Sequence, residues 1–140
     1  MFSQRIRRMM VRERMVKGAP GTSVSEAARL MAASATSAVV VIEDEALVGI
    51  FTERDAVFRV IAAGLDARIT PLSEVMTPKP LTVDPDRTFG YALQLMHEHR
   101  FRHVPVVENG RVVGIVTARD ALDPEMEEFV CEAQRREGIR

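Results

Sequence analysis

Two Thr-x-x-Asp motifs contain the residues best suited to chemistry. Thr52 and Asp55 form the first motif, and Thr117 and Asp120 form the second. At the start of a helix, such a threonine accepts a hydrogen bond from a free backbone N–H, and the acid lies favourably near the positive helix end. Helix capping therefore explains both motifs completely. The alternative is that the two carboxylates accept hydrogen bonds from a ligand.

Other signatures of catalysis or metal binding are absent from the sequence. There is no Ser/His/Asp order, P-loop or Gly-x-Gly-x-x-Gly motif. His97 and His99 would point about 200° apart on a helix, so they cannot share one metal ion. Cys131 is the only cysteine, which excludes an intramolecular disulfide and a cysteine-built metal site. We expect no catalytic residue, no metal site and no enzymatic activity.

The composition is that of an ordinary globular protein. The 140 residues are 46% hydrophobic and 28% charged, and the formal net charge is -1. A charge this small gives the whole protein no attraction to nucleic acid or membrane. No run approaches the roughly 20 apolar residues that span a bilayer. We therefore expect a soluble, cytoplasmic protein.

An internal repeat organises the chain. A shift of 65 residues places Val48 on Val113 and aligns both Thr-x-x-Asp motifs without a gap. Between the pairs 27/92 and 56/121, 13 of 30 positions are identical. Identity at this level over a fixed offset indicates a duplicated unit.

Each repeat shows the same pattern of predicted elements. Apolar spacing predicts helices over 25–33 and 88–99, and β-branched runs predict hairpins of 38–42 with 47–51 and of 104–107 with 112–116. A further helix over 55–63 ends at Gly64, another follows Asp120, and a lead-in strand is expected at 81–83. Asn109-Gly110 favours a type I′ turn.

These elements predict an α/β fold of two repeats, each a small sheet flanked by helices. A half of this length cannot enclose a core alone, so the repeats must pack together with pseudo-twofold symmetry. The cleft between them is the natural ligand site. The expected divisions are a basic helical segment at 1–17, repeats at 18–70 and 71–130, and a tail at 131–140.

The N-terminal segment is strongly basic. Six cations, Arg5, Arg7, Arg8, Arg12, Arg14 and Lys17, oppose Glu13 alone. Phe2, Ile6, Met9 and Met10 could line one helical face and dock it on this chain or a partner subunit. Binding of anionic lipid or nucleic acid and simple disorder are the alternatives. The acidic stretch 120–132 could also match this charge.

Four strings resemble the tandem cystathionine β-synthase (CBS) domain module over about residues 18–130. They are Val-Gly-Ile-Phe-Thr-Glu-Arg-Asp at 48–55, Val-Gly-Ile-Val-Thr-Ala-Arg-Asp at 113–120, His-Val-Pro-Val-Val at 103–107 and Val-Met-Thr-Pro at 75–78. The resemblance implies a ligand-sensing unit. Many family members bind AMP, ADP or ATP, and some bind NAD or S-adenosylmethionine.

The resemblance also implies candidate site residues. Asp55 and Asp120 would accept hydrogen bonds from the two ribose hydroxyls, and Thr52, Thr117 and free amides would hold a phosphate. Asp120 and Thr117 would face Thr36, Ser37 and Ala38, while Asp55 and Thr52 would face Phe101, Arg102 and His103. Val104 and Pro105 adjoin this region, and the proline favours an edge position.

Basic residues would hold the phosphates, because burying a polyphosphate without cations is prohibitive. The candidates are Arg54, Arg102, His103 and Arg119. Repeat one has Ser37 and Ala38 where repeat two has Arg102 and His103. We therefore expect the Asp120 site to be the stronger, with Arg102, His103 and Arg119 near its phosphates.

The expected function is a non-enzymatic regulatory module that senses an adenine nucleotide, requires no cofactor, forms a homodimer and acts on a protein partner. AMP, ADP and ATP are the leading ligands, ahead of NAD and S-adenosylmethionine. The alternative is a ligand-free dimerisation or docking adaptor in which both Thr-x-x-Asp motifs only cap helices.

Overall fold

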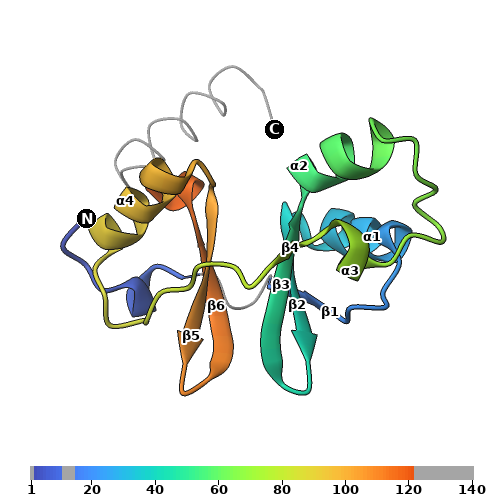
Figure 1. Cartoon of the computed structure of the whole chain (residues 1–140). Helices are drawn as coiled ribbons and strands as arrows, with labels where there is room; N and C mark the ends of the chain where they lie inside the picture. Colours follow the sequence, from blue (N-terminus) through green and yellow to red (C-terminus); the bar gives the residue numbers. More distant parts are fainter. Residues whose placement is uncertain (1, 11–14, 122–140) are drawn as a thin grey trace, which may run out of the picture.

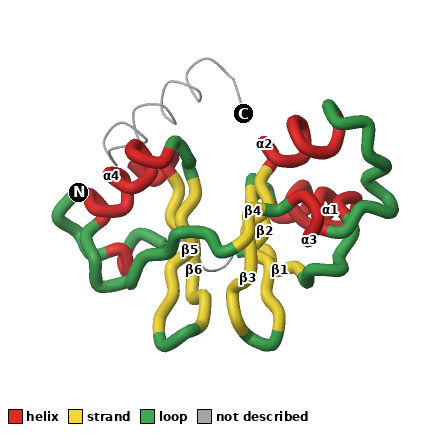
Figure 2. Tube along the Cα trace, in the orientation of Figure 1, coloured by secondary structure: helices red, strands yellow, loops and turns green. Residues whose placement is uncertain are grey.

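Two small sheets stand side by side in the middle of the molecule, with helices on their outer sides (Figure 1). The structure, a computed structural model, describes residues 2–10 and 15–121, with only the backbone at 120 and 121. One sheet has the strand order β1-β2-β3-β4, and the other pairs β5 with β6. The predicted α/β fold of two repeats, each with a small sheet flanked by helices, is confirmed (Figure 2).

The first repeat follows the predicted order of elements. It contains β1 (Val16–Gly18), α1 (Val24–Ser34), β2 (Ala38–Glu43), β3 (Ala46–Thr52), α2 (Glu53–Asp55) and the π-helical η2 (Ala56–Ile61). Ser23 caps α1 by accepting a hydrogen bond from the backbone N–H of Glu26. The predicted helix over 55–63 is also present. Most of it is a π-helix, a form often found at functional sites.

The second repeat has the same plan with a smaller sheet. Its region contains α3 (Leu72–Val75), β4 (Thr77–Pro78), α4 (Phe89–His99), β5 (His103–Glu108), β6 (Arg111–Thr117) and the 3-10 turn η3 (Ala118–Ala121). The expected lead-in strand at 81–83 is reduced to a parallel bridge between Val83 and Val106. Its counterpart in the first repeat is the parallel strand β1 on β2.

The two hairpin turns have matching geometry. Asn109 and Gly110 have φ values of 54° and 78°, as the type I′ prediction requires, and Asp44 and Glu45 have 51° and 67°. The residues that end α1 and α4 also correspond, since Ala35 and Arg100 both adopt the left-handed conformation. The duplication is therefore preserved in the backbone of the turns and caps.

Strand β2 is buried on both of its faces. Val39 and Val41 belong to the core beneath α1, whereas Ala38 and Val40 point to the other repeat. There they form an apolar layer with Ile50 of β3 and with two residues of β6, Val112 and Ile115. This central layer holds the two repeats together.

The short segment before each repeat packs on the other repeat. Leu72 and Val75 of α3 belong to the core of the first repeat, and β4 pairs with β3. Ile6, in the 3-10 turn η1 (Ile6–Arg8), is fully buried in the core of the second repeat. The expected boundaries at 18–70 and 71–130 therefore do not follow the packing, because the two leader segments, 6–10 and 72–78, cross over.

The described part of the N-terminal segment is not the expected continuous helix. Its backbone pairs with the loop before α4, where the N–H groups of Ile6 and Arg7 donate to the carbonyls of Arg87 and Pro85. Val16 and Lys17 belong to β1 instead. In the described residues of this segment, these pairings take the place of helical hydrogen bonds.

Arg7 carries the main electrostatic contact of this segment. It pairs with Glu108 and, at 3.3 Å between Nε and Oδ1, with Asp86. The hydrogen bonds to these two carboxylates raise the pKa of Arg7. The match that the sequence suggested, with the acids of 120–132, concerns side chains outside the described residues.

Two glycines inside strands make room for methionines of the leader segments. A Cβ atom on Gly49 of β3 would lie 2.3 Å from Sδ of Met76, and one on Gly114 of β6 would lie 2.9 Å from Sδ of Met10. These glycines therefore serve the packing of the crossed-over leaders.

In the described part of the chain, no helix combines the length and apolar character needed to cross a membrane.

Gly49→Ala should lower the free energy of unfolding by about 1–3 kcal/mol, because the added methyl group overpacks the contact with Met76. Urea denaturation measures the change. Gly21→Ala is the control, since nothing lies within 4 Å of a Cβ at that position. The cost should shrink in a Met76→Ala background, and an equal cost in both backgrounds would contradict the packing explanation.

Candidate functional site

A cavity of about 890 Å³ lies between the first repeat and the start of β5. Its lining comes from three places: the end of β3 with α2 and η2, the connector after β4, and the segment that joins α4 to β5. Six residues nominated from the sequence meet here, namely Thr52, Arg54, Asp55, Phe101, Arg102 and His103. The cavity thus lies where the cleft between repeats was expected.

Asp55 is a buried carboxylate at the start of α2, with 8% of the residue exposed. Its Oδ2 accepts hydrogen bonds from the backbone N–H of Thr52 at 2.9 Å and from Oγ1 of Thr52 at 3.2 Å. The Asp55 N–H in turn donates to Thr52 Oγ1. The motif is therefore a reciprocal capping box and, at the same time, part of the cavity wall.

The other oxygen of Asp55 faces a residue that the sequence analysis missed. Nε of Arg59 lies 3.5 Å from Asp55 Oδ1. The same guanidinium donates through Nη1 to the carbonyls of Val75 and Met76, at 3.3 and 3.2 Å. The spacing of four residues from Asp55 was the available signal, since such pairs share a helix face.

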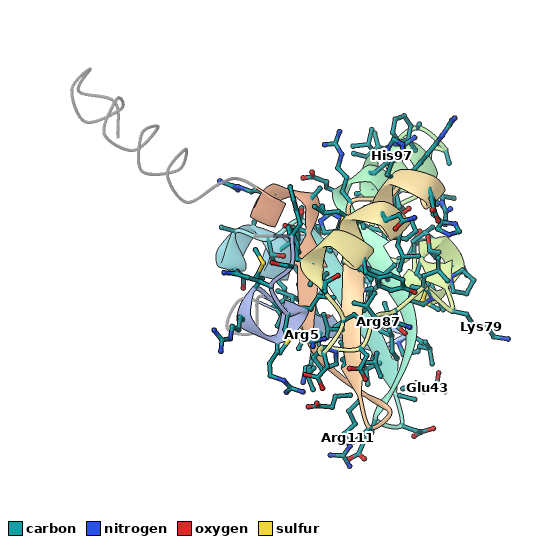
Figure 3. The ribbon with its side chains drawn as sticks, turned by 90° about the vertical axis from the view of Figure 1, so that its left-hand side faces the viewer. Arg5, Glu43, Lys79, Arg87, His97 and Arg111 are labelled. Carbon is teal, nitrogen blue, oxygen red and sulfur yellow. The ribbon has the colours of Figure 1, made fainter. Side chains whose placement is uncertain are left out.

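Most of the charged residues in the cavity lining are cations. The lining includes Arg54, Arg59, Lys79, Arg100 and Arg102, against the carboxylates of Glu53 and Asp55. The guanidinium of Arg54 stacks over the ring of Phe58 at 5.1 Å, and Lys79 extends outward from the connector (Figure 3). Lys79 and Arg100, both exposed and both with positive φ, were not nominated from the sequence. This excess of cations suits an anionic ligand.

One aromatic contact and one hydrogen bond shape the side of the cavity formed by the second repeat. The rings of His99 and Phe101 stack with their centroids 5.8 Å apart. His103, the first residue of β5, lies with Nε2 2.6 Å from Oγ of Ser37. Because Ser37 precedes β2, this hydrogen bond links the starts of the two equivalent strands across the pseudo-twofold axis.

The second candidate site is the Asp120 motif, and the Asp120 side chain lies outside the described part of the structure. The backbone repeats the first site, since Ala118 N–H donates to Arg102 O at 2.9 Å just as Glu53 N–H donates to Ser37 O at 3.0 Å. Thr36 and Ala38 are joined by a hydrogen bond, and Thr117 and Arg119 flank the start of η3. Arg102 and His103, which were expected to face Asp55 and also to lie near the phosphates of this site, line the Asp55 cavity.

Val104 and Pro105 do not line the cavity. Both are buried in β5, and the carbonyl of Pro105 accepts the N–H of Val83. The backbone of Pro105 thus faces the edge of β5 where only the bridge to Val83 forms, as its missing N–H led us to expect. Among the described residues, no three His, Cys, Asp or Glu side chains gather as a metal site would require.

A family model described as the CBS domain matches residues 6–62 and 72–125. The chain belongs to the CBS domain family. Each of the two matched segments begins near a leader segment that crosses over to the other repeat. The predicted membership and the predicted fold are both confirmed.

Solved structures similar to this CBS domain chain include two archaeal proteins. An uncharacterised conserved protein of Pyrococcus horikoshii is 34% identical, with 96% of this chain and 95% of that one covered at a TM-score of 0.79. A CBS domain protein of Pyrobaculum aerophilum, solved in complex with AMP, is 25% identical, with 92% and 99% covered at a TM-score of 0.78.

Among curated relatives, the meiotically up-regulated gene 70 protein of Schizosaccharomyces pombe is 42% identical over 110 residues. That match covers 71% of this chain and 15% of the yeast protein. The first curated relatives are much longer proteins, of which this CBS domain chain spans between 15% and 19%.

Thr52→Ala should lower the free energy of unfolding by about 1 kcal/mol, because it removes one half of the capping box. The midpoint of urea denaturation measures the loss. Thr82→Ala, at an exposed threonine of the connector, is the control. Equal midpoints for the two variants would contradict a capping role.

Proposed function

We propose that this chain is a non-enzymatic regulatory module that binds an adenine nucleotide in the Asp55 cavity and transmits its occupancy to a protein partner. The observation that carries the proposal is the cavity itself, whose lining combines a buried carboxylate at a helix start with five cations from both repeats and the connector. Its volume of about 890 Å³ is within the usual range for small-molecule sites. The AMP complex of the Pyrobaculum aerophilum relative supports the choice of ligand class.

The residues divide by chemistry in the proposed complex. Asp55 accepts hydrogen bonds from the ribose hydroxyls, and Arg54, Lys79, Arg100 and Arg102 neutralise the phosphates. Phe101 and Leu81 supply apolar surface for the base. AMP, ADP and ATP share these features, and NAD and S-adenosylmethionine are the other candidates.

We assign the first ligand to the Asp55 cavity, in place of the Asp120 site favoured from the sequence. The reason is that Arg102 and His103, the basic residues behind that earlier expectation, line the Asp55 cavity. Thr117, Arg119 and Asp120 with Thr36, Ser37 and Ala38 stay a second candidate site. The cytoplasmic location stays a prediction.

Isothermal titration calorimetry with AMP, ADP, ATP, NAD and S-adenosylmethionine tests the ligand class. We expect binding of at least one adenine nucleotide, and Asp55→Asn should weaken it about tenfold or more, as expected for loss of a hydrogen bond to a charged group. Glu74→Gln is the control, an exposed carboxylate outside the cavity lining. Absence of heat with all five ligands on folded protein would refute the proposal.

We also propose that the module is a homodimer formed through the helix after Asp55. Apolar side chains along η2 and the following loop are largely exposed, with Phe58 at 61%, Ile61 at 71% and Ile69 at 79%. Val57 and Phe58 line the cavity as well. One helix therefore contacts both the ligand site and the proposed interface, so a ligand that prefers one helix position would shift the dimer equilibrium.

Ile61→Glu should convert the dimer to a monomer, because a charge in an apolar interface is buried without a partner. Sedimentation velocity over a concentration series measures the change. Leu30→Glu, at an exposed leucine of α1, should leave the sedimentation coefficient of the dimer unchanged. A monomeric wild-type protein, or dissociation by both variants, would contradict the assigned interface.

A ligand-free docking adaptor is the second candidate, because the capping box already gives the Asp55 carboxylate a structural use. An adaptor would keep the same melting temperature with and without nucleotide, yet still recover a protein partner. If the chain is a regulatory module, its melting temperature should rise with nucleotide concentration, because the ligand binds the folded state.

A further inference from the structure

Arg59 joins three parts of the molecule that surround the cavity. It belongs to the π-helical η2, its Nε lies 3.5 Å from Asp55 Oδ1, and its Nη1 donates to the carbonyls of Val75 and Met76. Those carbonyls belong to the end of α3 and the residue after it, where a helix leaves its last acceptors unpaired. A single side chain thus connects the acid, the helix and the crossed-over leader.

The Asp55 carboxylate is held at both oxygens. Thr52 donates twice to Oδ2, and Arg59 faces Oδ1. An ionised carboxylate oxygen has two acceptor positions, so Oδ1 keeps capacity for a further donor. These contacts limit the rotation of the Asp55 carboxylate before a ligand binds. Binding then costs less conformational entropy, and such preorganisation increases affinity.

Arg59 also fixes a second wall of the cavity. The leader continues from Met76 into β4, which pairs with β3 at Gly49 and Ile50, and then into Lys79 and Leu81 of the lining. The hydrogen bonds to Val75 and Met76 therefore set where the connector runs relative to Asp55. This side chain therefore links the two walls in addition to the pairing of β4 with β3.

The duplication does not extend to this residue. The shift of 65 residues that places Asp55 on Asp120 places Arg59 on Pro124. A proline has no guanidinium and no backbone N–H, so the second motif has no equivalent donor at this position. The two acids therefore differ in a residue outside the Thr-x-x-Asp motif.

We propose that Arg59 is a positioning residue that orients Asp55 toward a ribose diol and makes the Asp55 cavity the site of higher affinity. The inference rests on the proposed function, because it concerns the same nucleotide site. It assigns sugar recognition to the pair of Asp55 and Arg59, so loss of the guanidinium should remove discrimination between ribose and deoxyribose.

The experiment compares the affinities for AMP and 2′-deoxyAMP by calorimetry. We expect the wild-type protein to prefer AMP about tenfold, the scale of one hydrogen bond to a charged acceptor. Arg59→Met should reduce this preference to about twofold, and Arg59→Lys should restore part of it, since an ammonium can still pair with Asp55. Arg68→Met is the matched control, because Arg68 pairs with Asp66 outside the cavity lining.

The ratio of the two affinities separates positioning from a merely structural role. A structural role would weaken both ligands equally and leave the preference for AMP intact in Arg59→Met, which would overturn the inference. Circular dichroism checks that each variant is folded, and Arg59→Lys provides the test if Arg59→Met is not.

The outcomes also separate this inference from the proposed function. If Asp55→Asn loses the preference and Arg59→Met keeps it, the site stands and the role of Arg59 fails. If Asp120→Asn abolishes the preference while Asp55→Asn keeps it, the assignment of the high-affinity site is wrong. If the wild-type protein binds neither nucleotide, the proposed function itself fails.

Discussion

The burial of β2 on both faces is the constraint on which the rest of the structure depends. Val39 and Val41 are covered by the helices of their own repeat, but Ala38 and Val40 require the sheet of the other repeat. A single repeat would expose this second face to water at a cost of about 25 cal/mol per Å² of apolar surface. Because the two sheets must meet here, the starts of β2 and β5 come together, and the cavity forms beside them.

The backbone of the two repeats is nearly symmetric, but equivalent positions carry different side chains. Glu53 N–H and Ala118 N–H make equivalent hydrogen bonds to the residues before β2 and β5. The residues at the accepting positions differ, however, since Ser37 stands in one repeat and Arg102 in the other. The cavity that contains Asp55 has five cations in its lining, and Arg102 of the second repeat is one of them.

Much of the fold could be predicted from the sequence, because β-branched runs, Asn109-Gly110 and the Ser23 cap each specify local structure. The crossing of the leaders could not be predicted, since a short segment with few apolar residues, such as 6–10, does not encode which sheet it will cover. The π-helix was equally hidden, because apolar spacing does not distinguish it from an α-helix. Of the site residues, Asp55, Arg54 and Arg102 could be nominated from the sequence. The presence of Lys79 and Arg100 in the cavity lining depends on where the connector and the end of α4 lie.

The crossed-over leaders constrain how such a chain could have arisen. Ile6 completes the second core and Leu72 completes the first, so neither half contains all of the residues that fill its own interior. An ancestral half-length polypeptide with this architecture would have filled its interior only by trading leaders with an identical copy. In one continuous chain both leaders come from the same molecule, so the two halves can differ in sequence.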